Sequence, residues 1–392
     1  MLWIQNGNVY APKALGVCDI LAAERKIAGI FPQGTLNAEV LRVIDPELSI
    51  LDARGRPVVP GIVDRHVHFN GAGGEGGPRF RTPPLQLSAF IEAGVTSAVG
   101  LLGTDGTCRS LRELLMKARG LEDEGISTWI YTGSYSVPSV TLTGDVMSDI
   151  CLIDKVIGLK MAISDHRSSH PSAEEIRRAV SDARTGGILS GKCGVVCVHM
   201  GSEKTSLTPL LQAIEDTDIP LTQYGPTHIT RCESLLRESA AFGKRGGNLD
   251  VTAETEKDPI FGKSTRQALR FLLDGGVPPE RITLSSDGNG SMPVFDEQGK
   301  MTGMAVGSIS TVLETLLSLW DDPELGGQTI LGMCTSNAAS QLGLKGKGQL
   351  EKGADADLLV LGDKKLLHVV AKGQVLMRDG AVLKRGTFEP RA

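Results

Sequence analysis

The sequence predicts an α/β protein built on a (β/α)8 barrel of the TIM type, with a small β-sandwich domain formed from both ends of the chain. Short apolar, β-branched runs recur eight times through the middle of the chain, and stretches with helical spacing, such as 110–119 and 173–180, separate most of them. Eight strand–helix units match the size and pattern of such a barrel. The eight runs are 58–69, 95–102, 127–135, 157–164, 195–200, 221–229, 249–252 and 282–286.

Both ends of the chain alternate short apolar runs with turn signals. In the first 55 residues the turn signals are Asn6-Gly7 and the charged segment 23–26, and near the C-terminus Asp379-Gly380 separates two short apolar runs. This spacing is typical of small antiparallel sheets, and neither end alone supplies enough strands for a stable sheet. We therefore expect one β domain from residues 1–55 and 346–392, and a barrel over residues 56–345.

A doubly wound parallel sheet is the structural alternative. Such a sheet would carry its ligand at a switch point near the first strand. In this chain, polar residues instead follow nearly every apolar run. The barrel is therefore favoured, because catalytic residues of barrels come from the carboxyl ends of many strands.

The composition argues against several classes of protein. With 41 Lys+Arg against 46 Asp+Glu, the net charge is 41 − 46 = −5, which disfavours binding to nucleic acid or to an anionic membrane surface. No run approaches 18 uninterrupted apolar residues, and the first residues show no basic segment followed by an apolar one. The seven cysteines are odd in number and scattered, which favours reduced thiols. We expect a cytoplasmic protein that forms a homo-oligomer, with an octamer as one candidate.

The polar residues at the strand ends form a set that suits metal binding. His66 and His68 lie two apart in a strand, so both side chains point to one side. Neutral imidazoles and carboxylates are ligands that suit Zn²⁺. Taken singly, a strand-end histidine is more often structural, and a lysine within an apolar strand can be salt-bridged or snorkelling. The complete set, each member at the end of a predicted strand, is His66, His68, Lys160, His199, His228 and Asp287.

In this set and its order the chain resembles the amidohydrolase superfamily and, within it, the isoaspartyl dipeptidase (β-aspartyl peptidase) family. The resemblance covers nearly the whole chain and extends to the C-terminal segment 335–360. No position of the family's motifs holds an incompatible residue. The segments that carry the narrower likeness are 73–78, 103–105, 132–139, 162–168, 199–201, 226–231 and 284–291.

The resemblance implies two Zn²⁺ ions per chain, bridged by a carboxylated Lys160 and by a hydroxide. His66 and His68 would hold one ion, and His199 and His228 the other. Asp287 would ligate the first ion, accept the proton of the hydroxide and deliver it to the leaving amine. Paired zinc ions supply both a nucleophile near neutral pH and a Lewis acid for the carbonyl group.

The narrower likeness implies a small dipeptide substrate with a β-aspartyl bond. Glu75 would bind the α-amino group, and Arg167 and Arg231 the two carboxylates. Thr104 and Ser291 would add hydroxyl donors, and Tyr135 would donate to the developing oxyanion. Asp287, Glu75 and Tyr135 form the predicted catalytic set.

Two other functions stay open on the sequence. Another amidohydrolase, such as a cyclic-amide hydrolase or an N-acyl amino acid deacylase, would share the metal ligands but need not share the substrate residues. A metal-free barrel with an assembly or regulatory role would be marked by lost ligands, and none is missing here.

Overall fold

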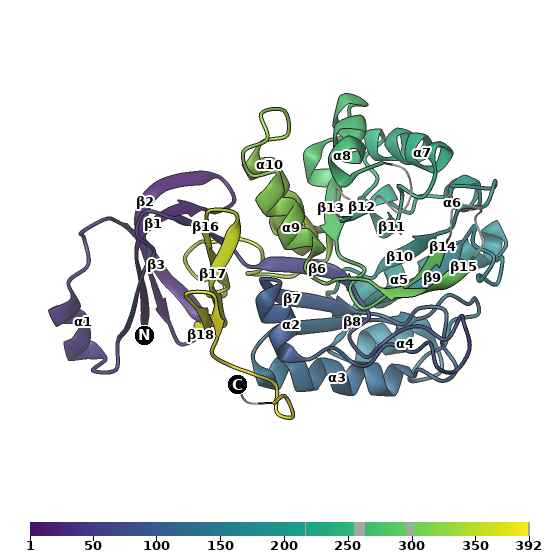
Figure 1. The fold of residues 1–392 in the computed structure, drawn as a ribbon. Coiled ribbons are helices and arrows are strands. Elements are labelled where there is room, and N and C mark those ends of the chain that lie inside the picture. Colours follow the sequence, from purple (N-terminus) through teal and green to yellow (C-terminus); the bar gives the residue numbers. More distant parts are fainter. Residues whose placement is uncertain (216, 255–262, 296–300, 391–392) are drawn as a thin grey trace.

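The structure, a computed structural model, describes residues 1–215, 217–254, 263–295 and 301–390, and within these residues it contains the predicted barrel. Eight parallel strands of this described part lie side by side in chain order (Figure 1). They are β6 (Ile62–Val67), β7 (Val95–Gly100), β8 (Ser127–Gly133), β9 (Val156–Ile163), β10 (Val195–Met200), β11 (Tyr224–Thr227), β12 (Leu249–Thr252) and β13 (Ile282–Ser285). Each coincides with one of the eight apolar runs, which confirms the predicted fold class.

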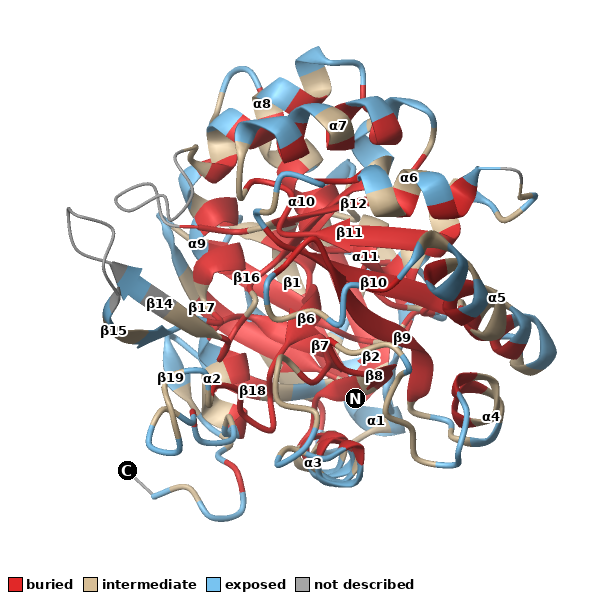
Figure 2. Ribbon diagram, turned by 90° about the vertical axis from the view of Figure 1, so that its right-hand side faces the viewer, coloured by how far each residue is buried: buried red, intermediate tan, exposed pale blue. Residues whose placement is uncertain are grey.

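A helix lies in each connection between successive barrel strands. These helices are α2 (Leu87–Glu92), α3 (Leu111–Glu124), α4 (Val146–Leu152), α5 (Ala173–Ser190), α6 (Thr208–Ile214), α7 (Glu233–Lys244) and α8 (Thr265–Asp274). Side-chain caps define several starts: the hydroxyl of Ser110 accepts from the Glu113 amide before α3, and Ser172 and Glu175 form a capping box before α5. Figure 2 shows the strands buried at the centre, with the outer faces of α5, α7 and α8 exposed.

The strand ends β13 and β6 meet and bring the sheet round to a barrel. Val67 and Gly288 form a parallel bridge, and the Ser286 hydroxyl donates to Asp64 over 2.5 Å. At the amino ends of the strands, Val63 and Val195 pack with helix α11 (Ser336–Gln341) in one apolar cluster. Because this cluster fills one end of the barrel, the carboxyl ends of the strands form its open end. Two helices, α9 (Thr311–Ser318) and α10 (Gly327–Cys334), lead from β13 to α11.

Strands from both ends of the chain form a second sheet, drawn in purple and yellow on the left of Figure 1. Among the described residues its order is β19-β18-β17-β16-β5-β1-β2-β3, with β4 beside β1. Its inward side chains share one apolar cluster, so the sheet curls around its own core. The strands are β1 (Leu2–Tyr10), β2 (Ala14–Ala23), β3 (Lys26–Pro32), β4 (Ser49–Asp52), β5 (Pro57–Pro60), β16 (Leu358–Gly362), β17 (Lys365–Ala371), β18 (Gln374–Arg378) and β19 (Ala381–Val382).

One predicted turn in this sheet is wrong. Asn6-Gly7 does not separate two strands but forms an irregularity within β1, where the pairing with β2 shifts register between Ile4 and Gly7. The Asn6 backbone has a positive φ of 53°, and its amide donates to the buried carboxylate of Asp19. A left-handed residue that is accommodated as a bulge keeps the strand continuous. The turns at 23–26 and at Asp379-Gly380 occur as predicted.

The first predicted run, 58–69, contains two strands rather than one. Strand β5 pairs with β1 and β16 in the terminal sheet, whereas β6 enters the barrel. Gly61 lies between them, and a β-carbon there would stand 2.1 Å from the Thr96 hydroxyl oxygen, so only glycine lets the chain pass this closely. The domain boundaries at residues 55 and 346 stay a prediction.

The remaining helices and strands belong neither to the barrel nor to the sheet formed by the two ends of the chain. Helix α1 (Ala38–Ile44) joins β3 to β4, and the 3₁₀ turns η1 (Leu221–Gln223) and η2 (Pro279–Arg281) precede β11 and β13. After β13, the hairpin β14 (Ser291–Phe295) and β15 (Met301–Val306) leaves the open end of the barrel. None of the helices within the described ranges is long and apolar enough to cross a bilayer.

Candidate metal centre and substrate pocket

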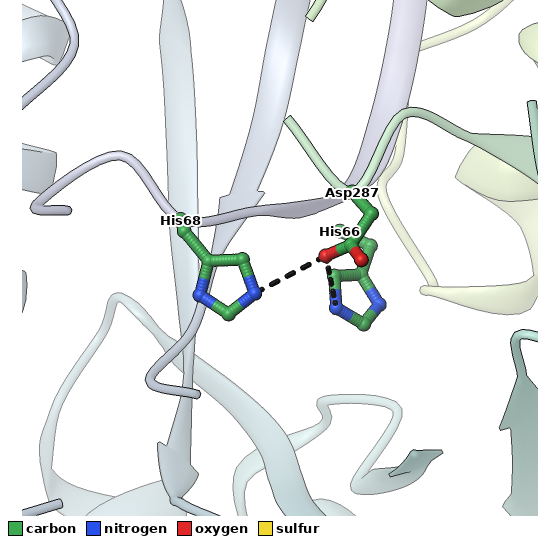
Figure 3. Close-up of side chains that lie close together, drawn as sticks. All are labelled: His66, His68 and Asp287. Atoms are coloured by element: carbon green, nitrogen blue, oxygen red, sulfur yellow. Dashed lines mark ion pairs between the residues drawn. The ribbon is translucent and has the colours of Figure 1, made fainter. Parts of the chain in front are cut away.

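Two imidazoles and one carboxylate meet at the open end of the barrel. His66 Nε2 and His68 Nε2 lie 3.3 and 3.2 Å from the same oxygen, Oδ1 of Asp287 (Figure 3). His66 is the last but one residue of β6, His68 directly follows the strand, and Asp287 lies two residues past β13, so the closure between these strands brings the three together. Their ligand atoms lie within 4.8 Å of one another. Asp287 Oδ1 is buried and accepts no hydrogen bond from any described residue.

The other three predicted ligands continue this cluster. Lys160 Nζ lies 3.4 Å from His66 Nε2. The ring centroid of His228 lies 4.9 Å from that of His66 and 4.7 Å from that of His199. The structure therefore brings all six predicted ligands to one place, although they come from five strands.

Two of these residues have a left-handed backbone. The φ angles are 60° at His228 and 51° at Asp287, a region that L-residues other than Asn and Asp adopt rarely and at some cost. His228 follows β11 directly, and Asp287 lies two residues past β13, so both stand where a barrel strand has ended. The left-handed backbone keeps each side chain aimed into the mouth of the barrel, which a continued strand would not do.

Burial keeps three of the potential histidine ligands in their neutral forms. The pKa values of His66, His199 and His228 are held well below the usual range, first by burial and then by neighbouring positive groups such as Lys160 and Arg231. Neutral imidazole is the form that binds a metal, so these three residues suit a metal site. Burial also lowers the pKa of Lys160, which favours the nucleophilic neutral amine.

Asp165 lies at the centre of a second group of contacts, beside the metal ligands. Its Oδ2 lies 2.9 Å from His199 Nε2 and accepts from Nη1 of Arg231 over 3.2 Å. The guanidinium of Arg167 donates to both oxygens, over 2.9 and 2.8 Å. Burial would raise the pKa of Asp165, but these donors hold it well below its usual range. On the other side of His199, the Tyr135 hydroxyl lies 2.7 Å from Nδ1.

A pocket opens next to the histidines and contains the predicted substrate residues. Glu75, the residue predicted to bind the substrate's ammonium group, accepts hydrogen bonds from the hydroxyls of Thr104 (3.0 Å) and Ser291 (2.9 Å). Arg167 Nη1 lies 3.5 Å from the same carboxylate. The lining residues that the sequence had singled out are His68, Glu75, Thr104, Tyr135, Arg167, Arg231, Asp287 and Ser291.

The residues present fit a metal centre. A buried carboxylate oxygen without a hydrogen-bond donor among the described residues faces two imidazoles, which is the donor set of a zinc or similar divalent site. The buried thiol of Cys197 also lies within this cluster. Its Sγ is 3.8 Å from Lys160 Nζ and 3.8 Å from His66 Nδ1.

Sequence reasoning assigned no role to two residues that contact the histidines. One is Asp165, which lies two residues past the end of β9 in a segment used only for the family likeness. The other is Thr252, the last residue of β12, whose hydroxyl lies 2.7 Å from His228 Nδ1. The rule that barrel strand ends carry functional groups would have found both, whereas their partners depend on the tertiary structure.

A (β/α)8 barrel with buried neutral histidines, a lysine and a carboxylate beside a charged pocket is the architecture of a metal-assisted hydrolase. Residues 58–376 match the profile of the Amidohydrolase family. The chain belongs to this family and is a hydrolase.

Solved structures and curated relatives add to this assignment. The chain is 42% identical to the β-aspartyl dipeptidase of Fervidobacterium islandicum AW-1, solved in complex with a β-Asp-Leu dipeptide, with a TM-score of 0.89 over 99% of this chain and 100% of that one. A D-hydantoinase structure, 17% identical with a TM-score of 0.67, shares the fold. The dihydroorotase of Lactobacillus gasseri is 24% identical over 91% of this chain and 88% of its own.

Proposed function

We propose that this chain is a binuclear zinc peptidase that hydrolyses the β-aspartyl bond of dipeptides. The observation that carries the proposal is one pocket beside the metal ligands that contains both signs of charge: Glu75 together with Arg167 and Arg231. A β-aspartyl dipeptide has one ammonium group and two carboxylates, which Glu75 and the two arginines could pair. The 42% identical β-aspartyl dipeptidase, solved with β-Asp-Leu, supports this choice of substrate.

The metal ligands are proposed as follows. His66, His68 and Asp287 would hold one zinc ion and His199 and His228 the other. Lys160 would bridge the two ions after its neutral amine has attacked CO₂, forming an N–C bond and losing a proton to give a carbamate. Within the described part of the chain, Lys160 Nζ lies within hydrogen-bonding distance of His66 and Cys197 and of no carboxylate, so its amine is not held as an ion pair.

When bound, paired zinc ions would supply a hydroxide nucleophile at neutral pH and polarise the scissile carbonyl. Asp287 Oδ1 has no hydrogen-bond donor among the described residues and lies at the pocket wall. It would therefore take up the nucleophile's proton and deliver it to the leaving amine. The Tyr135 hydroxyl, whose pKa burial raises, keeps its proton and would donate a hydrogen bond to the carbonyl oxygen.

Recognition of the substrate would depend on the charged walls of the pocket. Glu75 is held by two hydroxyl donors, so its carboxylate is oriented before a substrate ammonium arrives. Arg167 keeps Nη1 on the pocket side of its guanidinium, because Nε and Nη2 already donate to Asp165. The homo-oligomeric state and the cytoplasmic location stay predictions.

Hydrolysis rates of the zinc-loaded protein test the proposal. We expect rapid cleavage of β-Asp-Leu, with α-Asp-Leu, hydantoin and dihydroorotate cleaved far more slowly. The α-peptide has the same groups on a different carbonyl, so it controls for charge alone. Preferred opening of either cyclic amide would contradict the proposal and favour a cyclic-amide hydrolase, the activity of several relatives.

A further inference from the structure

The site has two halves, the proposed zinc ligands and the proposed substrate-binding residues, and Asp165 contacts both. Its carboxylate contacts His199, a proposed zinc ligand, and also Arg167 and Arg231, the proposed substrate cations. We propose that Asp165 is a positioning residue that couples the two halves: it sets the tautomer of His199 for zinc and orients both arginines for the substrate. This inference rests on the proposed function for its substrate half, whereas its zinc half stands on the metal ligands alone.

The tautomer follows from the chemistry of the neighbours of His199. Oδ2 of Asp165 can only accept, so at 2.9 Å the Nε2 atom of His199 must carry the proton. Arg231 Nη1, 3.0 Å from the same nitrogen, can only donate and so cannot be its hydrogen-bond partner at the same time. With the proton on Nε2, the lone pair of His199 lies on Nδ1, where the Tyr135 hydroxyl now donates. A carboxylate that accepts from the second ring nitrogen is a common way of fixing a metal-binding histidine.

The same carboxylate determines which donors the arginines present. Arg167 uses its Nε and Nη2 edge on Asp165 and leaves Nη1 toward Glu75 and the pocket. Arg231 contacts Asp165 through Nη1 while it lines the pocket as well. Without Asp165, the guanidiniums of Arg167 and Arg231 would lose the carboxylate that both of them contact. Each would then turn toward Glu75 or solvent, away from a substrate carboxylate.

Backbone contacts hold Asp165 in this position. Ser164, directly before it, has a left-handed φ of 53°, and its hydroxyl donates to the Ser206 carbonyl over 2.6 Å. Gly201, just past β10, lies so close that a β-carbon there would stand 2.4 Å from Asp165 Cα. The loops after β9 and β10 are therefore locked together with the carboxylate between them. The side chain is 3% exposed, so water cannot replace it.

The first test measures the wild-type chain and uses a variant only to assign its signals. Nitrogen-15 NMR of the metal-free protein, with the His199 signals assigned from a His199→Gln variant, should show the proton on Nε2. A proton on Nδ1 would overturn the zinc half of the inference.

The second test is Asp165→Asn, which keeps the shape and removes the charge. We expect zinc affinity to fall 10- to 100-fold, and KM for β-Asp-Leu to rise in variant protein saturated with zinc. Asp105→Asn is the matched control, because Asp105 also lines the pocket and pairs with an arginine, Arg81, but its hydrogen bonds go to Arg81 and to the amides of Thr107 and Cys108 and not to a proposed zinc ligand. This control should keep its zinc affinity. Thermal melting of each variant checks that it is folded.

The outcomes separate this inference from the proposed function. Unchanged zinc affinity and unchanged KM in Asp165→Asn, in a protein that cleaves β-Asp-Leu, would overturn the inference and leave the function intact. If the wild-type chain does not cleave β-Asp-Leu, the proposed function fails, and the substrate half fails with it. The zinc affinity and the NMR result still test the zinc half in that case. If Asp165→Asn does not fold, the His199 tautomer in the wild-type chain tests the zinc half.

Discussion

Replacing Arg231 by methionine should separate substrate recognition from metal binding. The substitution removes the guanidinium and keeps an unbranched apolar chain. The Arg231 side chain is 14% exposed and lines the pocket, so a carboxylate bound there would lose its cation in a largely dry place. Truncating one partner of such a pair costs about 2–5 kcal/mol. Because about 1.4 kcal/mol is a factor of ten in rate, kcat/KM for β-Asp-Leu should fall roughly 30- to 4000-fold.

Three substrates show which carboxylate Arg231 binds. β-Ala-Leu lacks the α-carboxylate of β-Asp-Leu, and β-Asp-leucinamide lacks the carboxylate of the leucine. In a double-mutant cycle, the loss of kcat/KM caused by Arg231→Met should persist with one of these two substrates and nearly vanish with the other. Arg167→Met, measured in parallel, should show the opposite preference.

Zinc content is measured on the same samples. Arg231→Met should keep both ions, since Asp165 still holds His199. Equal losses on all three substrates, or loss of zinc together with activity, would show that Arg231 is structural. Either result would refute the reasoning and return the substrate assignment to another amidohydrolase.

The other predictions concern the metals, the lysine and pH. His66→Ala should lower both the hydrolysis rate and the zinc content, which is measured by mass spectrometry. A chelator should abolish the activity, and added zinc should restore it. An active enzyme without stoichiometric metal would contradict this prediction. Lys160→Ala should be nearly inactive and partly rescued by short carboxylic acids, whereas an unmodified lysine in the zinc-loaded protein would refute the carbamate. Burial lowers the folded-state pKa of His66, His199 and His228 below the value of about 6.5 in an unfolded chain. In acid, the unfolded state of the metal-free protein therefore binds more protons than the folded state, so the free energy of unfolding should fall as pH drops below about 6.5. Urea titrations at pH 7 and pH 5 measure this free energy, and a higher value at pH 5 would contradict the prediction.

The barrel and the set of site residues could be predicted because both follow from local patterns. A buried parallel strand is apolar along its whole length, so each barrel strand appears as a short apolar run. A side chain at or near the carboxyl end of such a strand lies toward the open end of the barrel whatever lies elsewhere in the chain. This is why Lys160, His199 and His228 could be placed at one site from positions far apart in the sequence, and why they lie together in the structure.

Local patterns were less reliable at the junctions between elements. Asn6-Gly7 has the composition of a tight turn, yet β1 continues through it because pairing with β2, last made at Ile4, resumes at Gly7. The apolar run 58–69 is uninterrupted in composition, yet Gly61 divides it between two sheets. In both places the partner strand decides the structure, and the partner is distant in the sequence.

The fold, the family likeness and the set of side chains at the barrel mouth could all be predicted from sequence patterns. How those side chains are paired could be seen only in the tertiary structure. That Asp165 accepts from His199 and from both arginines, or that Cys197 lies beside Lys160, depends on distances between loops of different strands. The physical reason is that periodicity specifies the direction of a side chain from its own strand, whereas a hydrogen bond also requires the position of its partner to within a few tenths of an ångström.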